Sequence, residues 1–124
     1  TCALPILVRY EERMADVYAA SDLMIGRGGA GTVADVATVG VPSILVPWSG
    51  ATDDHQRGNI RWLSDDGAAV LLDESEVGDR LSETIAELRV DRTRLDDLGR
   101  RARDKGEPNR RGAIIDVIEE IAGA

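Results

Sequence analysis

The chain has 124 residues and a formal net charge of −8, with 43% hydrophobic and 31% charged residues. This length allows one domain with a real core and is too short for two, and the acidic balance argues against a nucleic-acid backbone as partner. It does not exclude a single nucleotide, since a local group of backbone N–H donors binds phosphate even in an acidic protein. No apolar run approaches the ~20 residues of a membrane span, and the only cysteine, Cys2, excludes a disulfide framework and a cysteine-based metal site.

The start of the chain is unusual, because its first residue is Thr1 rather than an initiator methionine. Residues 1–6 match the translation of ACG TGT GCT CTT CCG ATC, the tail of a widely used sequencing adapter. We hypothesise that these residues are read-through from a fragmentary gene and that the true protein extends further upstream. Resequencing the source clone would refute this if the codons proved to be genomic.

Four short apolar runs predict strands, at residues 6–8, 23–25, 44–46 and 69–72. Each run is nearly continuous rather than alternating, as expected of parallel strands that are covered on both faces. Helical patterns separate the runs, which predicts right-handed βαβ units. The fold class is therefore α/β, a Rossmann-like parallel sheet with flanking helices.

Apolar residues at helical spacing mark the expected helices, the fourth of which is opened by Ser75 and Gly78. Leu95 and Leu98 indicate a short helix, and a last helix is expected over residues 109–122. The apolar faces are, in chain order: Met14, Val17 and Tyr18; Val33, Val36, Ala37 and Val39; Ile60 and Leu63; Leu81, Ile85 and Leu88; Leu95 and Leu98; Ile114, Ile115, Ile118 and Ile121.

A glycine-rich turn lies between the second predicted strand and the helix that follows it, where residues 26–31 read G-R-G-G-A-G. The first-turn N–H groups of a helix are unpaired and its dipole adds about half a positive charge, so this point favours an anion such as phosphate. The alternative is a purely structural turn that lets strand and helix pack tightly. Asp35, in about the first turn of the helix, favours the binding site, because its carboxylate could accept hydrogen bonds from sugar hydroxyls.

A polar cluster, residues 53–56, follows the third predicted strand, and ligands of open parallel sheets bind at the carboxyl ends of strands. Asp53 and Asp54 are candidates either for this site or for helix N-caps and partners of the helix dipole in the first turn. His55 is either a ligand-binding residue or a capping or surface residue, and Asn59 either touches a ligand or holds the loop through backbone hydrogen bonds. Because one histidine beside two adjacent aspartates does not easily converge on an ion, we expect no metal.

Several motifs in order resemble the donor-binding half of MurG-type transferases, from about Tyr10 to the C-terminus. These enzymes transfer N-acetylglucosamine from UDP-N-acetylglucosamine to undecaprenyl-pyrophosphoryl-muramoyl-pentapeptide, making lipid II for peptidoglycan. The motifs are Tyr10-x-x-x-Met14, Tyr18-Ala-Ala-Ser-Asp22, Arg27-Gly-Gly-Ala-Gly-Thr-Val-Ala-Asp35, Gly40-Val-Pro-Ser-Ile-Leu-Val-Pro47, Asp54-His55-Gln56-x-x-Asn59 and Gly67-Ala-Ala69.

The resemblance implies a role for each matching residue. Tyr10 and Glu11 would face uracil, and the backbone of Glu11 would read its edge. Asp35 stands where the family usually has a glutamate on the ribose hydroxyls and is one methylene shorter. His55 and Gln56 would bind hydroxyls of N-acetylglucosamine, supported by Asn59. The diphosphate would be bound by N–H groups of Ala30, Gly31 and Thr32 and by the Thr32 hydroxyl, with Arg27 and Gly29 in the same motif.

The implied fold is the C-terminal domain of a two-domain GT-B glycosyltransferase, of which residues 1–124 are an incomplete part. The family needs no metal or other cofactor. The acceptor site, the membrane contact and the proposed catalytic base belong to the N-terminal domain, which this sequence lacks, so the lipid-linked acceptor and the inner face of the cell membrane would be reached only through that domain. The expected location of the whole enzyme is cytoplasmic and peripheral to the membrane.

In a 3-2-1-4-5-6 sheet the four apolar runs would be strands 3 to 6, so central strand 1 and its neighbour are missing. We therefore expect marginal stability, pairing through exposed strand edges and weak UDP-sugar binding, ~mM or worse. Three alternatives stay open: another GT-B UDP-sugar transferase acting on a glycolipid or natural product, a non-catalytic nucleotide-binding α/β domain, and a purely structural fragment. The Asp-His-Gln segment with Asn59 favours lipid II synthesis over another GT-B reaction.

Overall fold

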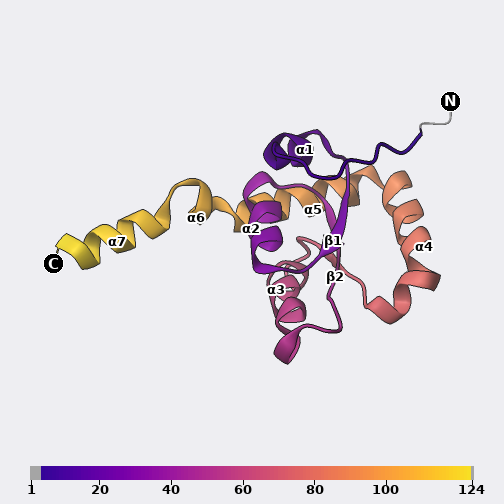
Figure 1. Ribbon diagram of the computed structural model, residues 1–124. Helices are drawn as coiled ribbons and strands as arrows, with labels where there is room; N and C mark the ends of the chain where they lie inside the picture. The colour runs from indigo at the N-terminus through magenta and orange to yellow at the C-terminus, as the bar shows by residue number, and fades with distance from the viewer. Residues whose placement is uncertain (1–3, 124) are drawn as a thin grey trace.

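A computed structural model describes residues 4–123 and shows a three-stranded parallel sheet with flanking helices (Figure 1). The predicted α/β class is confirmed. The elements in chain order are α1 (Met14–Ala20), β1 (Met24–Arg27), α2 (Ala30–Val39), β2 (Ser43–Val46), η1 (Thr52–Asp54), α3 (His55–Ser64), β3 (Val70–Leu71), η2 (Glu74–Glu76), α4 (Val77–Val90), α5 (Arg92–Lys105), α6 (Glu107–Arg110) and α7 (Ala113–Gly123).

The sheet has the order β1-β2-β3, with β2 in the middle and fully buried. Its side chains alternate between two hydrophobic clusters, so both faces of the sheet are covered. Leu45 packs with residues of α2 and α3, whereas Ile44 and Val46 pack with residues of α4 and α5. In Figure 1, α2 and α3 accordingly lie on one side of the strands and α4 on the other.

The predicted strand at residues 6–8 is wrong, because this segment forms neither a helix nor a strand. Ile6 and Leu7 are 89% and 91% exposed. A strand needs a hydrogen-bonding neighbour, and in the expected sheet order this run would be strand 3, which pairs with strand 2. Among the described residues no such neighbour exists, and β1 itself is an edge of the sheet.

The C-terminal helices also differ from the prediction. The expected helix over residues 109–122 is split into α6 and α7, because Gly112 adopts a positive φ of 71° that a continuous helix does not allow. The helix marked by Leu95 and Leu98 is longer than expected, since α5 has 14 residues. Figure 1 shows α7 extending away from the sheet. Its isoleucine side chains are exposed.

The fourth predicted helix begins with a different signal from the expected Ser75. Asp73 and Glu76 form a reciprocal capping box, in which the Glu76 carboxylate accepts the Asp73 N–H at 3.0 Å. This capping box opens η2, which leads into α4, and it holds Glu74 directly beyond the carboxyl end of β3.

Candidate functional site

The carboxyl ends of the three strands bring together the segments that sequence analysis singled out. Arg27 ends β1 and leads into the glycine turn, the loop after β2 contains Trp48 and Ser49, and Glu74 follows β3.

The N-terminus of α2 is open. Its N-cap is Gly29, which offers no side chain to the first-turn donors, and the Val33 N–H is the one that reaches the Gly29 carbonyl, at 3.0 Å. The N–H groups of Ala30, Gly31 and Thr32 precede that bond and have no partner within the helix. A Cβ on Gly29 or Gly31 would meet no atom within 4 Å. Free donors and open space thus coincide at the positive end of the helix dipole.

Gly28 is different, because it is buried against α3. A Cβ there would lie 2.4 Å from Ile60 Cδ1 and 2.8 Å from the Gln56 carbonyl oxygen. Gly28 is therefore required for packing, whereas Gly29 and Gly31 leave open space beside the turn.

Gln56 and Asn59 fasten this turn to α3. The Gln56 side-chain oxygen accepts the Gly28 N–H at 3.2 Å and the Trp48 N–H at 2.9 Å, and Asn59 Nδ2 donates to the Gly28 carbonyl at 3.0 Å. Asn59 thus holds the loop through a hydrogen bond to the backbone, which was one of the two roles expected for it from the sequence. The amide nitrogen of Gln56 has no hydrogen bond within residues 4–123, so it can still donate to a ligand. Its contact with a sugar stays a prediction.

Glu74 links the same two loops and was missed at the sequence level. One carboxylate oxygen accepts from Arg27 Nη2 at 2.9 Å and the other from the Ser49 N–H at 3.3 Å. Hydrogen bonds from Ser49 and from the Arg27 guanidinium hold the pKa of Glu74 below its ordinary value. Its position just after a strand, at the edge where ligands bind, is the signal that could have identified it.

Arg57 ties the loop after β2 to the segment after β3. It pairs with Asp54 at 2.9 Å and also with Asp73, and the hydrogen bond that Arg57 donates to Asp73 is the main cause of its raised pKa. Asp53 and Asp54 lie in the first turn of η1, and Asp54 occupies the N-cap position of α3, but neither side chain makes a capping hydrogen bond. Both residues have left-handed φ values, 53° and 55°, a strained conformation for residues other than glycine.

His55 and Asp35 flank the turn from two helices. His55 is the first residue of α3, exposed and without a hydrogen bond within the described chain. Asp35 lies in the second turn of α2 rather than the first, about 7.5 Å along the axis from Ala30. The pKa of Tyr18 is raised mainly by burial of Tyr18, and the negative charge of Asp35 raises it further. Both side chains are free to meet a ligand, and their sugar contacts stay predictions.

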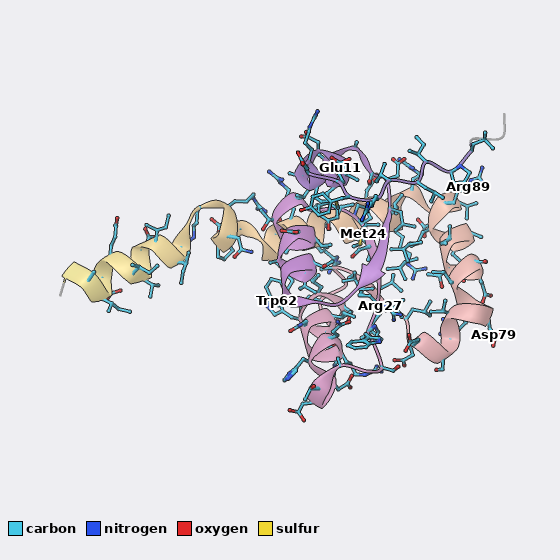
Figure 2. All side chains as sticks on the ribbon, viewed as in Figure 1. Glu11, Met24, Arg27, Trp62, Asp79 and Arg89 are labelled. Atoms are coloured by element: carbon cyan, nitrogen blue, oxygen red, sulfur yellow. The ribbon has the colours of Figure 1, made fainter. Side chains whose placement is uncertain are left out.

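Tyr10 and Glu11 are not brought to this edge. Tyr10 is 81% exposed, and Glu11 accepts the Arg13 N–H at 2.8 Å. In Figure 2 Glu11 lies beside α1, separated from Arg27 by the length of β1. The expected uracil contact is therefore not assembled with the glycine turn, and it stays a prediction.

A groove of about 310 Å³ opens beside Arg27 and Glu74, with Val46 and Leu81 in its wall. A larger cavity, about 900 Å³, lies elsewhere, between the segment before β3 and α5. Within residues 4–123 no three His, Cys, Asp or Glu side chains gather as they would around a metal ion. In the same part of the chain, none of the helices has the length and apolar character needed to cross a membrane.

The family model for the glycosyltransferase family 28 C-terminal domain matches residues 5–112. The chain belongs to this family. The match includes the glycine turn, the polar cluster after β2 and the Asp73–Glu76 capping box, and so the whole edge described above.

Relatives of known name agree with this family assignment. The chain is 42% identical over 118 residues to the UDP-N-acetylglucosamine--N-acetylmuramyl-(pentapeptide) pyrophosphoryl-undecaprenol N-acetylglucosamine transferase of Halorhodospira halophila, covering 94% of this chain and 33% of that protein. The enzyme of the same name from Azoarcus sp. is 44% identical over 110 residues, or 88% and 30% of the two proteins. The chain thus spans about a third of the length of the relatives it matches.

A solved structure confirms the fold. The crystal structure of Acinetobacter baumannii MurG superposes with a TM-score of 0.78 at 34% identity, covering 91% of this chain and 34% of the MurG chain. The expected Rossmann-like C-terminal glycosyltransferase domain is therefore confirmed as the fold of this family member.

Proposed function

We propose that this chain forms the donor-binding part of a transferase that moves N-acetylglucosamine from UDP-N-acetylglucosamine to a lipid-linked muramoyl-pentapeptide, forming lipid II. The observation that carries the proposal is the open N-terminus of α2, where the first three N–H groups have no partner within the helix and a Cβ on Gly29 or Gly31 would meet no atom within 4 Å. The family and the names of its relatives supply the substrate class.

Different residues at this edge would bind the diphosphate, the ribose and the sugar of the donor. The N–H groups of Ala30, Gly31 and Thr32 would hold the diphosphate, and the helix dipole would stabilise the negative charge that develops on it as the sugar leaves. Asp35 would accept hydrogen bonds from the ribose. His55 and the free amide nitrogen of Gln56 would reach sugar hydroxyls.

The other parts of the reaction would come from outside this chain. In the proposed enzyme the acceptor, the catalytic base and the contact with the inner face of the cell membrane belong to an N-terminal domain. In this proposal the N-terminus of α2 supplies the positive potential to the diphosphate.

The test is a matched pair of glycine variants, made in the complete protein encoded by the recovered upstream sequence. Gly31 and Gly78 each occupy the second position of a helix, and a Cβ meets nothing within 4 Å at either site. Each alanine stabilises its helix by up to about 1 kcal/mol. Gly31→Ala places a methyl group where the diphosphate would lie, so we expect at least about tenfold weaker UDP-N-acetylglucosamine binding, roughly 1.4 kcal/mol.

Binding and transfer are both measured, with the lipid-linked muramoyl-pentapeptide as acceptor. Equal loss of binding in Gly31→Ala and Gly78→Ala, or none in either, would refute the donor site. Binding of the UDP-sugar without transfer to this acceptor would instead favour another GT-B transferase with a different acceptor.

A further inference from the structure

Two side chains bridge the same pair of loops at adjacent positions. Gln56 joins Gly28 to Trp48, and Glu74 joins Arg27 to Ser49. We call these four contacts the double bridge. Because the bridged residues are consecutive in both loops, the double bridge fixes the glycine turn relative to the loop after β2.

The two halves of the double bridge differ in chemistry. Gln56 is neutral and bonds only backbone N–H groups, so it acts as a spacer between the loops. Glu74 is a carboxylate that bonds one backbone N–H and one guanidinium, which makes the bond to Arg27 charge-assisted. Only the Glu74 half therefore restrains a charged side chain, and that side chain belongs to Arg27, two residues before Gly29, the N-cap of α2.

Arg27 is well placed to use this restraint. It immediately precedes the buried Gly28, and its side chain is 51% exposed. Only its Nη2 is engaged by a protein group within residues 4–123, which leaves Nε and Nη1 as donors toward solvent. A free arginine loses much rotamer entropy when it binds an anion, and an arginine already held by a carboxylate loses less.

We propose that Glu74 is a positioning residue of the donor site, which holds Arg27 and the loop at Ser49 in place for a nucleoside diphosphate sugar. This inference rests on the proposed function for the identity of the ligand. Glu74 touches no substrate in this assignment and acts through Arg27. The lowered pKa of Glu74 agrees with a carboxylate that stays charged in this role.

The test compares Glu74→Gln with Glu87→Gln. Glu87 also pairs with an arginine, Arg94 at 3.2 Å, and the two pairs are similarly exposed. Glu87→Gln thus removes an equivalent surface ion pair within α4 and α5, away from the site. The ¹⁵N-labelled 124-residue chain is titrated with UDP-N-acetylglucosamine, because amide chemical shifts report weak binding and loop structure in one experiment.

We expect Glu74→Gln to weaken binding about three- to tenfold, the range for losing the preorganisation of one long side chain. Glu87→Gln leaves binding unchanged. Because Glu74 acts through Arg27 and also holds Ser49, adding Glu74→Gln to Arg27→Met causes a smaller further loss than Glu74→Gln causes in the wild type, whereas a role independent of Arg27 gives additive losses. Wild-type affinity in Glu74→Gln, or additive losses in the double variant, would overturn the proposal.

Amide hydrogen exchange separates this inference from the proposed function. If the wild-type chain shows no shifts with UDP-N-acetylglucosamine while a folded amide spectrum is retained, the donor assignment is what fails. The bridge is then judged from the Ser49 amide, which exchanges faster in Glu74→Gln than in the wild type or in Glu87→Gln. Unchanged exchange at Ser49 would refute the bridge itself.

Discussion

At the scale of single residues, two acidic side chains, Glu74 and Asp35, differ in their contacts with the rest of the protein. Glu74 is fixed by Arg27 and Ser49, and its pKa is lowered, so its contribution to stability is present above its ordinary value of 4.5 and is lost as the pH falls through the lower pKa of the folded state. Asp35 is exposed on α2, and its effect is seen instead on a buried neighbour, Tyr18.

Tyr18 provides a spectroscopic test of where Asp35 lies. Burial and the charge of Asp35 raise the pKa of Tyr18 above 10.0. The chain has two tyrosines, so Tyr10→Phe leaves Tyr18 as the only titrating phenol. We expect an absorbance titration midpoint above 10.0, and a smaller rise after Asp35→Asn, since burial remains. A midpoint of 10.0 in the folded protein would contradict this packing.

The sign of the effect on stability is fixed by the same shift. A raised phenol pKa in the folded state contributes stability that is fully present below 10.0 and is lost as the pH rises through the folded pKa. Alkaline unfolding of Tyr10→Phe should therefore accompany the ionisation of Tyr18.

Sequence reasoning located the glycine turn, Asp35 and the polar cluster because each depends on local order along the chain. It could not establish that the Gln56 oxygen is already occupied, since both of its donors, Gly28 and Trp48, are placed by the ends of β1 and β2. The link from Glu74 to Arg27 spans 47 residues and likewise requires the folded sheet.

At the scale of elements, the turn between β1 and α2 is packed against α3 through one glycine. A Cβ on Gly28 would overlap Ile60, while one on Gly29 would meet no atom within 4 Å. We expect Gly28→Ala to lower the free energy of unfolding by about 1–3 kcal/mol, the usual cost of overpacking. Gly29→Ala is the neighbouring control and should change it by less. Urea unfolding of both variants checks this, and equal losses would show that the turn rather than its packing is sensitive.

The elements that the sequence predicted well are those marked by residues within or directly beside the element itself. The strands at 44–46 and 69–72 are continuous apolar runs, and α2 ends where Gly40 takes a φ of 82°. The run at residues 6–8 has the same apolar character, but a strand also depends on a partner, which a pattern along one segment does not reveal. The break between α6 and α7 likewise depends on the backbone of Gly112.

At the scale of the whole molecule, the uncovered apolar groups include those of α7 and those at the edge of the sheet. On α7 the exposed residues include Ile114, Ile118 and Ile121. At the sheet, β1 is an edge strand, and the Met24 N–H donates to the Pro42 carbonyl on the β2 side at 2.8 Å. Because backbone groups alternate in direction along a parallel strand, Ile25 and Arg27 direct theirs to the open edge. Unpaired backbone beside an apolar side chain is a template for pairing with another strand.

We therefore expect the 124-residue chain to self-associate through the edge of β1, with a second copy as the partner. Ile25 is 45% exposed at this edge, so Ile25→Lys adds a charge that opposes pairing without removing a buried group. Ile118→Lys makes the same change on α7, where Ile118 is 57% exposed. Sedimentation velocity over a range of concentrations should show a shift toward monomer in Ile25→Lys and little change in Ile118→Lys. The opposite pattern would assign the contact to α7, and a monomeric wild-type chain at every concentration would refute pairing through β1 altogether.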